Sequence, residues 1–233
     1  MKSKILALAL ALAAVPATSA FSLNEVKPDF DAYVSLLNDK GYVIRSYDIS
    51  QLADTTYMLG LIVREYDGGK MIHDGSERFN YMIRNRLMAS GFSESARASL
   101  DPAEMADPEK GIVTLGSRIN IGLSPLNDST LRVSMEIPET GASYQQLALR
   151  PQTHPATGQI QHNYRDRPFK VQEFQSDTFI PLLFVGSAWY DPEIGVFRFC
   201  GENEISPDLS EEIVSHVPHF YVVGIQAYKQ KDK

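Results

Sequence analysis

Hydrophobic and polar residues alternate with a period of two along several segments of the chain, and this alternation predicts β-strands. In the segment 112–123, Val113, Ile119 and Ile121 alternate with polar residues. A proline-containing turn follows and leads into a second apolar run, so we predict a hairpin. By these criteria we expect strands at 42–47, 55–66, 112–123, 131–137, 195–200 and 220–228.

Other segments have the three-and-four spacing that is typical of amphipathic helices. In the segment 28–40, Phe30, Val34 and Leu37 fall on one helical face. The segment 77–89 shows the same spacing and ends close to a glycine, a common helix terminator. We therefore predict helices at 28–40 and 77–89, and one or two helical turns at 210–216.

Two segments fit neither pattern clearly. In the segment 177–190, Phe179, Leu182 and Trp189 suit a short buried helix or a core strand, because a short apolar run does not distinguish the two. We favour the helix. The segment 138–170 contains four prolines and few apolar residues, so we expect a long loop there.

The order of these elements predicts the fold class. It runs as helix, two strands, helix, two strands, a long loop, then a helix or strand and two further strands. Such an order, with hairpins and few crossovers, is typical of an α+β fold. We expect a mixed or antiparallel sheet with helices packed on one face.

One stretch resembles a known group of domains. A predicted helix that ends in Leu87-x-x-x-Gly91-Phe92 is followed by Ala106-Asp107-Pro108 and the predicted hairpin. This layout resembles bacterial envelope α+β domains of unknown function, and it covers about a quarter of the chain. The resemblance implies an envelope domain and carries over no catalytic residue.

The first twenty residues have the three-part layout of a secretory signal peptide. Lys2 and Lys4 precede an apolar run of 11 residues at 5–15, and small residues follow at 16–20. This run is shorter than the ~20 residues that a membrane-spanning helix needs. We expect cleavage after Ala20. A phenylalanine rather than a cysteine follows that position, so we expect no lipid anchor.

Export and length together suggest the domain organisation. We expect the signal peptide 1–20 to be followed by one exported domain, periplasmic or secreted, at 21–233. Within it, 21–137 and 171–233 are candidate sub-domains that the loop 138–170 would join. No second segment of transmembrane length occurs in the sequence of the mature chain, so we expect no transmembrane segment there.

The net charge bears on the expected partners, and the single cysteine bears on whether disulfides stabilise the fold. Without Lys2 and Lys4 the chain has 20 Lys and Arg against 29 Asp and Glu, a net charge of −9. This acidic balance argues against nucleic acid as a partner. Cys200 cannot form an intramolecular disulfide, and we expect it to pack as a small residue at a strand end.

The sequence shows no recognisable catalytic, metal or cofactor motif. The Gly-x-Ser-x-Gly elbow, the Gly-x-Gly-x-x-Gly fingerprint and the Walker pattern are absent. His216 and His219 are separated by Val217 and Pro218, and the ligand spacing of a zinc protease is missing. We therefore predict no catalytic residue, no metal site and no cofactor.

A basic segment is the best candidate for binding. The region 141–170 carries four basic residues and one acidic residue in an otherwise acidic chain. Aromatic rings beside arginines suit sugars or peptides, since ring faces stack and guanidinium groups form paired hydrogen bonds. The candidate binding residues are Arg150, His162, Tyr164, Arg165 and Arg167.

These observations favour a binding protein over an enzyme. We expect an exported bacterial envelope protein whose partner is another envelope protein or a glycan. One alternative is an exported hydrolase that acts on glycan or peptide, with scattered carboxylates or histidines meeting in a cleft. Another is an assembly subunit that uses the terminal strand 220–228 as an exposed edge.

Overall fold

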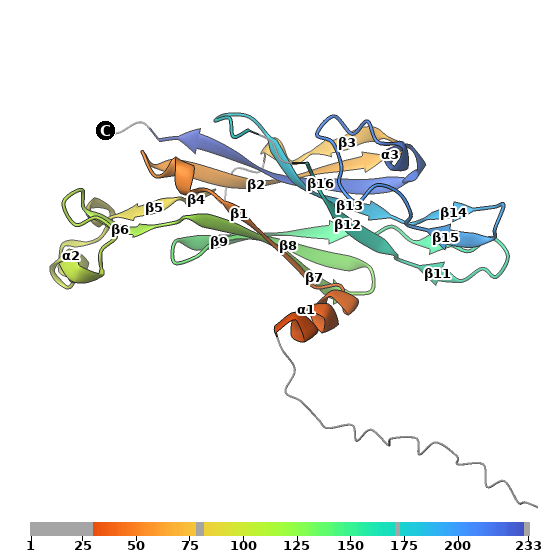
Figure 1. Cartoon of the computed structure of the whole chain (residues 1–233), viewed down its shortest axis with the longest axis horizontal. Coiled ribbons are helices and arrows are strands. Elements are labelled where there is room, and N and C mark those ends of the chain that lie inside the picture. Colours follow the sequence, from red (N-terminus) through yellow and green to blue (C-terminus); the bar gives the residue numbers. More distant parts are fainter. Residues whose placement is uncertain (1–29, 78–81, 171–172, 231–233) are drawn as a thin grey trace, which may run out of the picture.

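The fold is built from two antiparallel β-sheets that pack face to face (Figure 1). The computed structural model describes residues 30–77, 82–170 and 173–230. The signal peptide and its cleavage site, predicted at 1–20, lie outside the described residues.

The smaller sheet has four strands in the order β1-β7-β8-β9. The predicted hairpin is confirmed, because β7 and β8 pair in antiparallel register from Asn120 opposite Glu136 to Asn127 opposite Thr130. Alternate residues of these strands point inward, as the sequence pattern requires. The strands are β1 (Val43–Asp48), β7 (Arg118–Asn127), β8 (Thr130–Ile137) and β9 (Gly141–Ala148).

The larger sheet has six strands, in the order β12-β13-β16-β2-β3, with β4 also paired to β2. Strand β16 lies in the middle and pairs with β13 on one side and β2 on the other. The hypothesis of an exposed terminal edge at 220–228 is therefore wrong. The strands are β2 (Tyr57–Asp67), β3 (Lys70–Asp74), β4 (Met82–Arg84), β12 (Tyr164–Pro168), β13 (Ile180–Ser187) and β16 (His219–Lys229).

The main hydrophobic core lies between the two sheets. Ile121 and Met135 of the smaller sheet are fully buried against residues of the larger one, among them Leu59 and Val223. A second apolar cluster covers the opposite face of the larger sheet, where Phe220 contacts residues from the 205–217 segment. Strands β13 and β16 are therefore buried on both faces.

Shorter elements extend the two ends of the sandwich (Figure 1). At one end are α2 and the pair β5–β6, and at the other are the pairs β10–β11 and β14–β15. Their bounds are α2 (Glu94–Ala98), β5 (Arg86–Met88), β6 (Ile112–Leu115), β10 (Gln152–Thr153), β11 (Ile160–Gln161), β14 (Trp189–Asp191) and β15 (Val196–Arg198). The remaining helices are α1 (Phe30–Asp39) and α3 (Glu212–His216).

The predicted α+β class is wrong, because most of the ordered structure is antiparallel β-sheet. Helix α1 confirms the predicted helix at 28–40 over the described part of that segment, yet it buries no residue. Helix α2 buries none either. Among the α-helices of the described part, only the short α3 buries side chains, Ile213 and Val214, against a sheet, while the 3-10 turn Ser50–Leu52 buries Leu52 in the main core.

The helix predicted at 77–89 is also wrong where the structure describes it. Residues 78–81 lie outside the described part, residues 82–88 contain β4 and β5, and Glu77 and Ala89 belong to 3-10 turns. Asn85 between them is fully buried and uses its whole amide: Oδ1 accepts from the backbone N–H of Tyr57, and Nδ2 donates to the carbonyls of Leu52 and Thr55. These tertiary hydrogen bonds hold the segment extended and override its helical spacing.

Three further interpretations need correction. The segment 177–190 contains β13, not a helix, because all eight residues of this strand are buried between two apolar layers. The predicted loop 138–170 contains β9, β10, β11 and β12. One face of β9 is exposed and carries polar residues, so the segment has few apolar residues and its composition resembles that of a loop. Cys200, expected to be packed, is exposed beyond β15.

Candidate functional site

The five predicted binding residues lie in three different environments. Arg150 belongs to a polar network and Arg167 is buried, whereas His162 and Arg165 line the surface beside β1. Tyr164 belongs to both the network and that surface. The structure therefore brings together only part of the predicted set.

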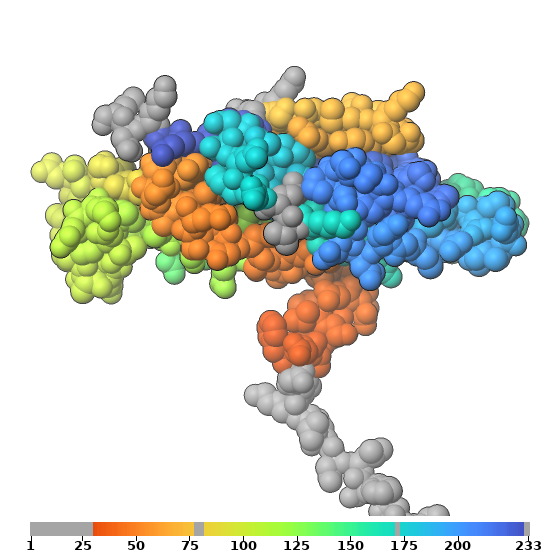
Figure 2. Space-filling view, turned by 45° about the horizontal axis from the view of Figure 1, so that its top comes forward, coloured from red at the N-terminus to blue at the C-terminus, as the bar shows by residue number. Residues whose placement is uncertain are grey.

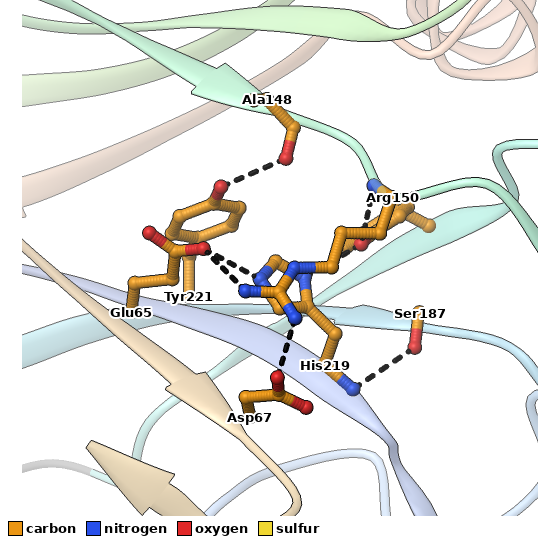
Figure 3. A network of polar contacts seen from close by, with 8 residues as sticks. Glu65, Asp67, Ala148, Arg150, Ser187, His219 and Tyr221 are labelled. Atoms are coloured by element: carbon orange, nitrogen blue, oxygen red, sulfur yellow. Dashed lines mark hydrogen bonds and ion pairs between the residues drawn. The ribbon is translucent and has the colours of Figure 1, made fainter. Parts of the chain in front are cut away.

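Figure 3 shows the polar network, whose residues come from both sheets. Glu65 at the end of β2, His219 at the start of β16 and Tyr164 of β12 follow the inward-facing positions of their strands. Arg150, just beyond β9, reaches across from the smaller sheet. The network thus joins the two sheets where the apolar core ends.

Its hydrogen bonds form a closed ring. The backbone N–H of Arg150 donates to Tyr164 Oη at 3.0 Å, so the tyrosine hydroxyl donates to Nδ1 of His219 at 2.6 Å. Nε2–H of His219 then donates to Glu65 Oε1 at 2.9 Å, and Nη2 of Arg150 donates to the same oxygen at 3.2 Å. Nη1 of Arg150 also pairs with Asp67 Oδ2 at 2.5 Å.

The protonation states of the ring follow from burial. Burial raises the pKa of Tyr164 to about 12, so its hydroxyl keeps its proton. Burial also lowers the pKa of His219, although its hydrogen bond to Glu65 acts in the opposite direction. A neutral imidazole with Nε2–H fits the donor directions of the ring. Both ring nitrogens of His219 are already bonded within the network, so this arrangement suits a structural role in holding the two sheets together.

Arg167 is also structural. Arg167 lies on the face of β12 opposite to Tyr164, and the residue is only 9% exposed. Nε donates to the carbonyl of Glu202 at 2.9 Å, and Nη2 donates to the carbonyl of Phe199. Burial lowers the pKa of the guanidinium. Arg167 therefore anchors the 199–202 segment and does not present its charge to a ligand.

The remaining predicted residues lie at a groove between α1 and the edge of the sandwich. Arg165 lines this groove, which has a volume of about 660 Å³. A smaller adjoining cavity of about 260 Å³ is lined by His162, Tyr164 and Arg165. The two hollows share lining residues Asn38, Val43, Arg165 and Asp166. They form one continuous feature, which we call the α1–β1 groove.

The groove is mostly apolar. Helix α1 stands out from the body as a separate lobe (Figure 2), so its apolar side chains remain accessible. Phe30 is 78% exposed and Ile44 on β1 is 74% exposed. The large apolar residues that line the groove are Phe30, Tyr33, Val34, Leu37, Tyr42, Val43 and Ile44.

An ion pair closes the base of the groove. Arg45 of β1 and Asp166 of β12 meet with Nη2 and Oδ2 2.6 Å apart, and both side chains are partly buried. Tyr47 Oη donates to the carbonyl of Leu182 at 2.9 Å beside it. The ion pair joins the edge strands of the two sheets, and the tyrosine hydrogen bond joins β1 to the inner strand β13, so these contacts separate the groove from the main core.

Sequence reasoning missed the apolar residues of this groove. The spacing of Phe30, Val34 and Leu37 correctly indicated a helix, but it equally indicated a face packed on a core. Whether such a face is covered depends on the tertiary structure. The available signal was a short apolar-faced helix followed by the consecutive apolar residues Tyr42, Val43 and Ile44, which place apolar side chains on both faces of a strand.

The described residues show neither a candidate membrane helix nor a candidate metal site. None of their helices combines the length and the apolarity that a membrane crossing requires. In the same residues, no three histidine, cysteine or acidic side chains are grouped in a way that could hold a metal ion. The groove and the polar network thus contain all the predicted residues except Arg167.

Comparison with known proteins identifies a family. The family described as "Domain of unknown function (DUF5041)" matches residues 12–229, which is nearly the whole chain. Neither the curated proteins nor the solved structures gave a match. The chain belongs to the DUF5041 family.

Proposed function

We propose that this chain is an exported, non-catalytic binding domain of the bacterial envelope, which holds an apolar segment of a partner protein in the α1–β1 groove. The observation that carries this proposal is the exposed apolar lining of the groove. Contiguous apolar surface of this kind marks interaction sites in folded proteins, because water contacts it unfavourably. A glycan needs more polar partners than this lining offers.

The edge position of β1 defines how the partner segment binds. Strand β1 is the terminal strand of the smaller sheet, with β7 on its paired side. An extended segment can add to such an edge through main-chain hydrogen bonds. Its apolar side chains would then contact Leu37 of α1 and Ile44 of β1, and Arg165 borders the same hollow.

The geometry favours binding over the alternative of an exported hydrolase. Glu65, His219 and Tyr164 resemble a catalytic relay in composition. Tyr164 Oη, both ring nitrogens of His219 and Oε1 of Glu65, however, bond to one another and to Arg150, and the raised pKa of Tyr164 makes its hydroxyl a poor nucleophile. A hydrolase needs a reactive group whose bonding capacity is free for the substrate.

Export is supported by the sequence alone. The basic start, the 11-residue apolar run and the small residues up to Ala20 are the parts that a signal peptidase pathway recognises. The mature protein in the source cell would begin at Phe21. Its mass, measured on protein recovered from the periplasm or medium, tests this part of the proposal. A full-length mass or a cytoplasmic location would contradict it.

Site-specific photo-crosslinking in the source cell tests the groove. A crosslinker at position 44 should join the chain to a partner protein, whereas one at position 136, exposed on the outer face of β8, should not. Mass spectrometry of the crosslinked peptide should identify an apolar segment. Adding Leu37→Asp should abolish the crosslink while the circular dichroism spectrum stays unchanged. Equal crosslinking from both positions, or a hydrophilic crosslinked peptide, would contradict the proposal.

A further inference from the structure

A second cavity lies between the β14–β15 pair and helix α3. Its volume is about 500 Å³, and it shares no lining residue with the α1–β1 groove. Its lining combines aromatic rings with several acidic side chains. The residues that matter here are Trp189, Tyr190, Asp191, Glu193, Glu202 and Glu212.

The aromatic rings are held in fixed positions. Trp189 stacks on His216 of α3, with ring centroids 5.8 Å apart and planes inclined by 19°. Tyr190 packs edge-on against Phe197 of β15, at 5.6 Å between centroids, and against His154 at 5.3 Å. Neither ring therefore needs to be ordered when a ligand binds, which lowers the entropic cost of binding.

The charges of the cavity are predominantly negative. Four carboxylates line it, together with one guanidinium, that of Arg198. Arg198 Nη1 pairs with Asp191 Oδ2 at 2.6 Å, and this contact lowers the pKa of Asp191. Arg198 is thus committed to one carboxylate. Glu193, Glu202 and Glu212 supply the negative charge in excess.

These carboxylates surround the rings from different elements. Glu193 comes from the turn between β14 and β15, and Glu212 opens α3. Glu202 lies on the segment that Arg167 anchors, and its Oε2 accepts from the backbone N–H of Ile213 at 3.4 Å. The negative charge is therefore distributed around an aromatic cavity whose position the fold fixes.

We propose that this cavity binds an organic cation through its ammonium group. Aromatic faces attract ammonium groups through the ring quadrupole, and nearby carboxylates add direct attraction. An anionic ligand would be repelled by the carboxylates of Glu193, Glu202 and Glu212, although Glu212 Oε1 also lies 3.8 Å from Nε2 of His216. A free amine and the side chain of a lysine in a peptide share this chemistry. The site is separate from the α1–β1 groove, so either proposal can fail alone.

The single tryptophan makes the test direct, because Trp189 is the only one in the chain and lies in the cavity. Its fluorescence should change saturably when the full mature protein is titrated with choline or with lysine amide acetylated on its α-nitrogen. The uncharged isostere of choline, in which carbon replaces the nitrogen, should bind at least tenfold more weakly. A response to choline alone identifies a free quaternary ammonium compound, and a response to the lysine derivative alone identifies a primary ammonium group such as that of a peptide lysine.

Matched variants assign the effect to the cavity. The double variant Glu193→Gln with Glu212→Gln should weaken cation binding about tenfold or more, because two of the carboxylates lose their charge. Glu136→Gln, on the outer face of β8, should leave the affinity unchanged. Cys200 is exposed and lines the cavity, so the bound cation should slow its alkylation.

Either of two results would overturn the proposal. One is equal binding of choline and its uncharged isostere. The other is the absence of any cation effect on both Trp189 fluorescence and Cys200 alkylation. Crosslinking from position 44 tests the groove independently, so its outcome does not depend on this one.

Discussion

The inner strands of the larger sheet and the α1–β1 margin contain similar apolar residues in opposite environments. Phe184 and Phe220 are fully buried, whereas Phe30 is 78% exposed. Strands β13 and β16 are covered by the smaller sheet on one face and by the 205–217 segment on the other. Within the part of the chain that the structure describes, helix α1 buries none of its side chains. The first set of side chains therefore stabilises the fold, and the second is available for binding.

The size of this difference follows from the area removed from water. Burying a large apolar side chain contributes about 1.5–3 kcal/mol relative to leaving it exposed. The residues of β13 and β16 make this contribution within the single chain. The residues of α1 can make it only when a partner covers them. Substitutions in the two regions should therefore affect different measurements.

The largest expected effect is that of Phe220→Ala. The Phe220 ring stacks on Phe184 with centroids 4.8 Å apart and on Tyr66 at 4.6 Å. Removing it leaves a cavity in the second apolar cluster, so the free energy of unfolding should fall by about 3–5 kcal/mol. Urea denaturation followed by circular dichroism measures this change.

Phe30→Ala is the matched control for that variant, since it removes the same ring from an exposed position. Its free energy of unfolding should stay within about 0.5 kcal/mol of the wild type. Phe220→Leu, which keeps most of the volume, should lose less stability than Phe220→Ala. Similar losses at positions 30 and 220 would show that α1 is covered in solution.

The same contrast explains which parts of the fold could be predicted from sequence. The β7–β8 hairpin was predictable because one face of each strand is buried, which produces a period of two. In β13 every position is buried, so the alternation disappears and the apolar run fits a helix as well. The segment around Asn85 was misread because its extended form depends on hydrogen bonds to residues distant in sequence.

The candidate site was predictable only in part, for a related reason. A basic and aromatic segment indicated Arg165 and His162, which do line the groove or its adjoining cavity. Sequence could not indicate that Arg167 is buried or that Arg150 and Tyr164 belong to the polar ring. Alternation along β12 places successive residues on opposite faces, and the environment of each face depends on other strands.

An intermediate effect is expected for His219→Gln in the polar ring, where the two sheets are joined. The imidazole is 3% exposed and bonds to Tyr164 and Glu65. Its loss leaves buried polar groups with poorer partners, so the free energy of unfolding should fall by about 1–3 kcal/mol near pH 8. Urea denaturation at several pH values measures both the loss and its pH dependence.

The pH dependence follows from the lowered pKa of His219. Because burial lowers this pKa in the folded state, the unfolded chain binds the proton more readily. The contribution is complete above the ordinary histidine pKa of about 6.5, and it is lost as the pH falls toward the lower folded value. The stability difference between wild type and His219→Gln should therefore shrink between about pH 8 and about pH 5. A constant difference would contradict a lowered pKa.

The smallest expected effect on stability is that of Leu37→Ala at the α1–β1 margin. Leu37 is 49% exposed and lines the groove, and alanine is a good helix former. The free energy of unfolding should therefore change by less than about 0.5 kcal/mol. Leu183→Ala in β13, where the side chain is fully buried, should instead cost about 2–5 kcal/mol.

Partner crosslinking from position 44 should weaken in Leu37→Ala despite its unchanged stability, because the apolar contact is lost. If Leu37→Ala destabilised the chain as Leu183→Ala does, α1 would belong to the core and the groove would lose its role in binding.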